Sequence, residues 1–236
     1  YVGGLVGLKS GYYMQEVDAE RITVHAMGYK YVGVLIGYIS TNRTSSRLIT
    51  DDITVNAPNA ASYVGGDAGY ADSPNKTAGG LMESLIKVTI EAKSAQTNVG
   101  GLIGYGKDIC WLYWNTVEAT VKAPNANYVA GVIGQLENNG GQFHMYRTLV
   151  STDVTGKDYV GAMIGYSGTY QPVGNDGTYA GIYCDLIAAR LKVAESQDQA
   201  TASYVYSNKV DGAVQKDVIP VSVGASSPYP YRQRLW

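Results

Sequence analysis

The chain has 236 residues, of which 45% are apolar and 16% are charged, and its formal net charge is −2. This composition excludes a disordered chain, because many apolar residues and little net charge allow a core to be buried. Lys and Arg are scattered, so no basic patch predicts a nucleic-acid partner. Gly or charge interrupts every apolar run well before the ~20 residues that cross a bilayer, so we expect no membrane span.

Glycine and tyrosine are over-used in this chain, with 29 Gly and 21 Tyr residues against a single Phe. A tyrosine joins a broad apolar ring to a hydroxyl, which suits half-wet surfaces and interfaces. We therefore expect much of the chain to lie at partly hydrated surfaces or at interfaces.

An eight-residue frame, Tyr-Val-Gly-Gly-Leu-Ile-Gly-Tyr with small variations, recurs six times in the first part of the chain. The repeat anchors that open it are Tyr1, Tyr31, Tyr63, Asn98, Tyr128 and Tyr159, at steps of 30, 32, 35, 30 and 31 residues. Self-similarity at a fixed period of this length is the signature of a repeat architecture. The sequence therefore predicts about six units of ~31 residues.

A second element precedes the second to fifth frames and alternates β-branched with polar residues. Its central residues stand seven or eight positions before the anchors; they are Val24, Val55, Ile90 and Val121. Such alternation predicts a strand with one buried face. Pro and Asn in residues 56–59 and 123–126 predict turns, and no helical period persists.

We therefore predict an all-β fold, a β-solenoid or β-helix-like stack in which each unit buries its apolar edge against its neighbours. Stacking would bring the anchor tyrosines into ladders along the long axis. A β-roll or sandwich of repeated hairpins remains the alternative, because alternation alone does not exclude it. We expect a repetitive domain over residues 1–200. A closing hairpin and an extended tail rich in Pro and Tyr should form residues 201–236.

The frame and its preceding Thr-Val strand resemble the GLUG-type repeat of microbial secreted and surface proteins. The resemblance covers residues 1 to 166 and departs from the pattern at Asp67, Ala130 and Ala162. It implies a β-rich repeat at the cell surface, often in adhesins or beside enzyme domains, and it does not imply catalysis by the repeats. A weaker likeness is to the structural protein of an archaeal (methanogen) sheath or surface layer.

The two cysteines, Cys110 and Cys184, predict a disulfide if the protein is exported. In a solenoid they belong to units two steps apart, about 9–10 Å along the axis at the usual strand spacing. A disulfide needs Cα atoms within about 7 Å. We therefore favour a bond between subunits, while an intrachain bond through offset loops stays open.

Two acceptor triplets begin at Asn42 and Asn75, at similar distances after their anchors, and both are glycosylation candidates on one exposed edge. Chance occurrence is the alternative. Trp111 and Trp114 could stack on sugar rings, or they could pack in the core or between subunits.

Nothing in the sequence predicts a catalytic or metal centre. The only histidines are His25 and His144, and no Cys or carboxylate stands at metal-ligand spacing. His25 occupies a slot that is polar in the other units, so we expect it to face outward. Asp67 is a candidate cation ligand. The simpler interpretation is that this copy of the frame is locally more hydrated, or that Asp67 contacts a partner. We expect no cofactor, no metal and no enzymatic activity.

These features together predict a self-assembling extracellular structural protein, a subunit of a cell-surface sheath, surface layer or filament. Its copies would associate through β-strand edges and Tyr-rich faces. The alternative is an adhesin-type carbohydrate-binding repeat module with cell-surface glycans as partners. The chain opens at Tyr1 inside a repeat and without Met, which indicates a trimmed, exported product.

Overall fold

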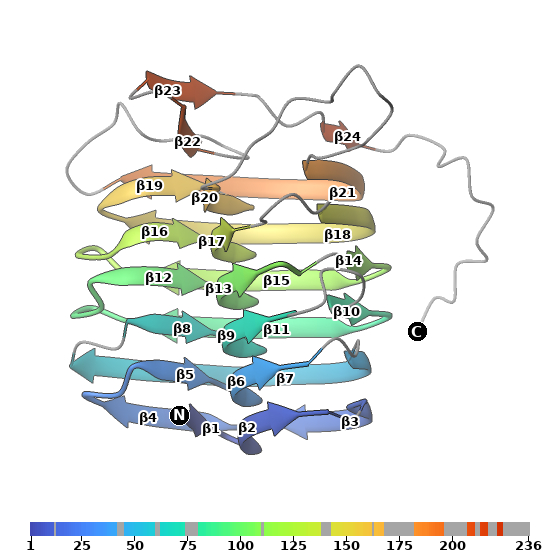
Figure 1. The fold of residues 1–236 in the computed structure, drawn as a ribbon. Helices are drawn as coiled ribbons and strands as arrows, with labels where there is room; N and C mark the ends of the chain where they lie inside the picture. Colours follow the sequence, from blue (N-terminus) through green and yellow to red (C-terminus); the bar gives the residue numbers. More distant parts are fainter. Residues whose placement is uncertain are drawn as a thin grey trace.

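The computed structural model describes residues 1–11, 13–41, 45–59, 62–73, 80–109, 111–137, 143–161, 163–167, 182–195, 207–210, 213–216 and 221–223. In these residues every regular element is a β-strand, which confirms the all-β prediction. The strands form successive coils that lie one above another (Figure 1). The six frames delimit five complete turns of a β-solenoid.

The two halves of each frame form two separate six-stranded parallel sheets. Sheet A contains β1 (Val2–Gly3), β5 (Tyr31–Gly33), β8 (Tyr63–Gly65), β12 (Thr97–Gly100), β16 (Asn127–Ala130) and β19 (Asp158–Gly161). Sheet B contains β2 (Val6–Ser10), β6 (Ile36–Ser40), β9 (Ala68–Asp72), β13 (Ile103–Lys107), β17 (Ile133–Glu137) and β20 (Ile164–Ser167).

The predicted second element lies in a third parallel sheet, sheet C. Its strands are β3 (Gln15–Glu20), β4 (Thr23–Met27), β7 (Ser45–Asn59), β10 (Gly80–Met82), β11 (Leu85–Glu91), β14 (Trp111–Tyr113), β15 (Thr116–Lys122), β18 (Phe143–Gly156), β21 (Ile182–Glu195) and β24 (Val221–Val223). β21 continues the sheet, with Val193 opposite Val154. The sequence therefore forms this element once more after the last frame.

Strand pairing decides between the two predicted architectures. Tyr31 lies opposite Tyr63, and Ile90 lies opposite Val121, so equivalent residues of successive units stack in register. Among the described strands, only β22 (Ser207–Val210) and β23 (Ala213–Lys216) pair antiparallel. The solenoid is confirmed, and the alternative of repeated hairpins is wrong. The proposed boundary near residue 200 stays a prediction, and the tail from residue 224 lies outside the described residues.

The core runs along the axis and is filled by one apolar side chain above another. Leu35, Ile36, Ile90, Leu102 and Ile133 are all fully or almost fully buried in it. They stack because the units repeat in register, so each coil covers the apolar side chains of the next.

The frame glycines allow sheets A and B to touch backbone to backbone. A Cβ atom on Gly33 would lie 1.9 Å from the Ile36 carbonyl oxygen, and one on Gly69 would lie 2.5 Å from the Val32 nitrogen. Any larger residue must therefore push the two strands apart.

Sheet C turns a corner at residues whose φ angles are positive although they are not glycine. Glu83 (φ 49°) and Trp114 (φ 53°) occupy equivalent places in successive coils. Inside the corner, the Asn115 side chain accepts a hydrogen bond from the Ser84 nitrogen (3.1 Å) and donates one to the Leu81 carbonyl (3.0 Å). This buried amide satisfies backbone groups that the corner removes from the ladder.

Candidate interaction surfaces

The first tyrosine column is formed by the anchors of the first three coils. The ring centroids of Tyr1 and Tyr31 lie 5.2 Å apart, those of Tyr31 and Tyr63 lie 5.1 Å apart, and both pairs are stacked. The Lys30 ammonium lies 5.3 Å from the Tyr31 ring centroid and 5.7 Å from that of Tyr63. The predicted anchor ladder is confirmed here.

A second column, which the sequence analysis did not single out, is formed by the last residue of the frame. Tyr38 and Tyr70 stack at 4.9 Å, and Tyr70 and Tyr105 stack at 4.8 Å. The sequence does contain the pattern that predicts this column, because the frame closes with Tyr in most units. The two columns meet edge to face, with Tyr31 at 5.5 Å from Tyr38 and 5.4 Å from Tyr70. We call the two columns together the double ladder; its members are Tyr1, Tyr31, Tyr63, Tyr38, Tyr70 and Tyr105.

Two amide side chains end the double ladder. Asn98 replaces the anchor tyrosine of the fourth coil, and Gln135 replaces the closing tyrosine of the fifth. They meet, because Asn98 Nδ2 donates a hydrogen bond to Gln135 Oε1 at 2.5 Å. Beyond them Tyr128 and Tyr159 form a separate aromatic cluster with Tyr166, at centroid distances of 4.8 and 5.3 Å from it.

Carboxylates lie beside the hydroxyl ends of the second column. The Tyr105 hydroxyl donates a hydrogen bond to the Glu137 carboxylate. Partial burial, followed by the negative charge of Asp72, raises the pKa of both Tyr38 and Tyr70 above its ordinary value. The phenols of this column therefore stay protonated at neutral pH.

Among the residues whose side-chain exposure is described, the large exposed apolar side chains lie in the first coil. Its large exposed side chains are Tyr1, Leu5, Leu8, Tyr13, Met27 and Tyr29, each between 46% and 64% exposed. Among the described strands, β1 and β2 end sheets A and B, and each pairs on one side only. An unpaired strand edge offers its N–H and C=O groups to a further strand.

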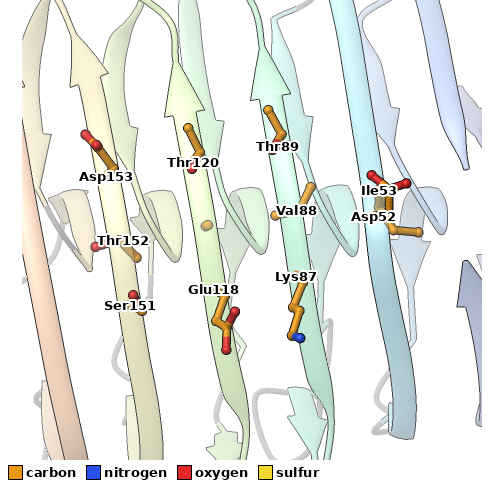
Figure 2. A pocket seen from close by; sticks show the side chains of 11 residues that line it. Asp52, Ile53, Lys87, Val88, Thr89, Glu118, Thr120, Ser151, Thr152 and Asp153 are labelled. Carbon is orange, nitrogen blue, oxygen red and sulfur yellow. The ribbon is translucent and has the colours of Figure 1, made fainter. Parts of the chain in front are cut away.

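The outer face of sheet C is polar and carries two rows of side chains that run from coil to coil. Thr89, Thr120 and Asp153 form one row (Figure 2). Lys87, Glu118 and Ser151 form the other. A shallow depression of about 370 Å³ lies along these rows. A second depression, of about 590 Å³ and lined by Lys93, Lys122 and Asn125, shares Thr120 and Asp153 with it.

Asp51 and Asp52 lie at the rim of this face, within β7. Neighbouring residues of a regular strand point to opposite faces, but both side chains are exposed. The reason is a β-bulge, because the register between β7 and β11 shifts by one residue here and Asp52 has a φ of 52°. Asp51 lies 3.7 Å from the Lys87 ammonium, so the pair is a solvated ion pair.

The aromatic cluster that was predicted as a glycan or interface site lies on β14 and at the corner that follows it. Leu112 points into the core, whereas Trp111 and Tyr113 are half-buried on the other face. Their ring centroids are 5.3 Å apart, and Trp114 lies 5.8 Å from Tyr113. The cluster is therefore partly accessible and is not part of the core.

Asp67 takes the frame position that holds Leu35 and Leu102 in neighbouring coils, and it is 2% exposed. Its Oδ1 atom has no hydrogen-bond partner among the described residues. Burial raises the pKa of Asp67 to about 6, although the nearby Lys9 opposes this shift. Lys9 is itself buried and donates a hydrogen bond to Ser45 Oγ at 2.7 Å. The expectation of a wetter frame or a partner contact at Asp67 is wrong.

The other predicted site residues are placed only in part. His25 is exposed opposite Asn56, as expected. Cys184 lies in β21 opposite Met145, but its side chain is not described. The other positions, Cys110, Asn42 and Asn75, lie outside the described residues. The disulfide and the glycosylation sites therefore stay predictions.

No family model, no curated protein and no solved structure matches this chain. In the described part of the chain, no three His, Cys, Asp or Glu side chains are grouped so that they could hold a metal ion. Nor does any described segment form a helix long and apolar enough to cross a membrane.

Proposed function

We propose that this chain is a non-enzymatic structural subunit that assembles with copies of itself through its first coil. The observation that carries the proposal is that large exposed apolar side chains lie on the first coil, which holds the end strands β1 and β2 of sheets A and B. An exposed apolar face beside an unpaired strand edge can accept a further coil.

The gain from such a contact follows from equivalent positions in the stack. Leu35 is fully buried under a neighbouring coil, whereas Leu5 in the same frame position is 46% exposed. Full burial of one such side chain is worth roughly 1.5–3 kcal/mol. Several of them, together with a row of backbone hydrogen bonds, are needed to exceed the roughly 4–15 kcal/mol lost on association. In a solution of this chain alone, a second copy supplies the covering coil.

We further propose that the assembly lies outside the cell, in a sheath, surface layer or filament. The support is the Tyr-rich, charge-poor composition together with the resemblance of the frame to GLUG-type surface repeats. Tyrosine columns along the coils provide rings that are half-buried and hydroxyls at the boundary with solvent.

Sedimentation velocity and electron microscopy of the 236-residue chain test the assembly. We expect concentration-dependent association that Leu5→Lys weakens, because a charge would be buried at the contact. Thr89→Lys adds the same charge to the outer face of sheet C and serves as the matched control. A chain that stays monomeric at high concentration, or that loses association equally in both variants, contradicts the proposal.

An adhesin-type carbohydrate-binding module is the second candidate. It is favoured by the half-buried Trp111 and Tyr113, which precede the polar strand β15, one of the strands that line the depressions on sheet C. Accessible aromatic rings and polar side chains are both suited to sugar recognition. A glycan array in which the chain binds and Trp111→Ala does not would support this function, and an array without hits would speak against it.

A further inference from the structure

The hydroxyl groups of the double ladder are not explained by ring stacking. Phenylalanine rings stack as well as tyrosine rings, yet the chain holds 21 Tyr and one Phe. Burying a phenol also requires a partner for its hydroxyl. Tyrosine at six stacked positions therefore places in two columns a group that can be oxidised as well as stacked.

Neighbouring phenols of the double ladder are close enough to react with one another. Stacked centroid distances within the second column are 4.9 and 4.8 Å, with interplanar angles of 6° and 18°. Tyr38, Tyr70 and Tyr105 are half-buried, so part of each residue remains accessible to solvent. Rotation about the side-chain torsions is needed to bring the ring carbons of neighbouring phenols from this stacked arrangement into bonding contact.

Proton acceptors lie near the phenols of the second column. A phenol that gives up an electron becomes a strong acid, so its oxidation is easier when a base takes the proton. The Glu137 carboxylate accepts the hydrogen bond of Tyr105. Asp72 acts electrostatically on both Tyr38 and Tyr70, and its Oδ1 atom is buried without a hydrogen-bond partner in the described part of the chain.

We propose that the double ladder is an oxidative cross-linking site, at which one-electron oxidation couples neighbouring tyrosines into dityrosine and joins successive coils covalently. Each phenol loses one electron to the oxidant and one proton to a carboxylate or water. Two phenoxyl radicals then form one carbon–carbon bond between ring positions ortho to the oxygens. The hydrogens on those carbons move to the oxygens and restore both phenols. A haem peroxidase supplied with hydrogen peroxide takes up the two electrons and two protons, and the peroxide is reduced to two waters.

The amide pair sets the limit of this reaction. Asn98 and Gln135 take the places of tyrosines between the double ladder and the Tyr128 cluster. Coupling therefore joins coils within the first four units, and the Asn98–Gln135 pair forms no covalent link. The pairs of tyrosines that become linked should therefore be the pairs whose rings stack.

The test treats the dilute 236-residue chain with peroxidase and hydrogen peroxide. Dityrosine is measured by its fluorescence, and the linked peptides are identified by mass spectrometry. We expect links between residues 38 and 70 and between 70 and 105. The triple variant Tyr38→Phe, Tyr70→Phe, Tyr105→Phe keeps the rings and should lose these links, with an unchanged circular dichroism spectrum.

The matched control is the double variant Tyr13→Phe, Tyr29→Phe. These two residues are more than half exposed and lie outside the double ladder. If stacking decides the reaction, this variant keeps the ladder links. Links that form mainly at Tyr13 and Tyr29, or equal dityrosine yields in the triple variant and in the unmodified chain, would overturn the proposal.

The proton acceptor is tested by Glu137→Gln. We expect slower formation of the link between residues 70 and 105, while the link between 38 and 70 in the same sample forms at its former rate. Equal slowing of both links, or no slowing of either, would show that Glu137 takes no part.

Discussion

Replacing the buried Asp67 by Leu should stabilise the fold at neutral pH. The folded protein raises the pKa of this carboxyl group from 3.8 to about 6, chiefly by burial. A difference of about two pKa units corresponds to roughly 3 kcal/mol of unfavourable free energy for the charged form. Leu restores the side chain that Leu35 and Leu102 provide in neighbouring coils, but the substitution also removes the charge that faces Lys9. We expect a net gain of about 2–3 kcal/mol.

The pH dependence of this effect has a definite sign. The folded protein binds the Asp67 proton more tightly than the unfolded chain does, because its pKa is raised on folding. The contribution of Asp67 to stability is therefore fully present below pH 3.8 and is lost as the pH rises through about 6. The free energy of unfolding of the Leu variant should lack this decline.

Urea unfolding followed by circular dichroism at pH 4, 5 and 7 measures both effects. Asp67→Asn removes the charge but keeps a buried polar group, so it should fall between the two proteins at pH 7. Asp18→Leu, at an exposed position of β3, is the matched control and should change stability by less than about 0.5 kcal/mol. A Leu variant that is no more stable at pH 7, or that retains the decline between pH 4 and 6, would refute the reasoning.

Three further experiments test the packing of the stack by the same unfolding assay. Gly69→Ala places a Cβ atom 2.5 Å from the backbone of sheet A and should cost about 2 kcal/mol or more. Asn115→Ala leaves two buried backbone groups unsatisfied and should cost about 2–4 kcal/mol; Asn125→Ala, which removes an exposed hydrogen bond, should cost much less. Asn98→Tyr combined with Gln135→Tyr continues the double ladder, and a double-mutant cycle should give a favourable coupling of about 0.5–1.5 kcal/mol. A coupling near zero would mean that these positions are energetically independent.

Much of the fold was predictable because the sequence repeats with a nearly constant period. The six frames and the Thr-containing strands gave the coil length, the strands and the all-β class, and stacking in register predicted the first tyrosine column. The corners of sheet C were not predictable, because Glu83 and Trp114 are residue types that seldom adopt positive φ. The bulge that exposes both Asp51 and Asp52 also left no sequence signal.

The sequence by itself determined which residues of successive coils stack on one another. In a solenoid, residues one period apart occupy the same position in successive coils, so Tyr31 and Tyr63 stack as a consequence of the period alone. The tertiary structure decided which residues at different positions of the frame lie side by side. The contact of Tyr31 with Tyr70, and that of Asn98 with Gln135, depend on how each frame turns from sheet A into sheet B. That turn and its offset between coils arise from backbone packing at the frame glycines, and a one-dimensional pattern carries no measure of them.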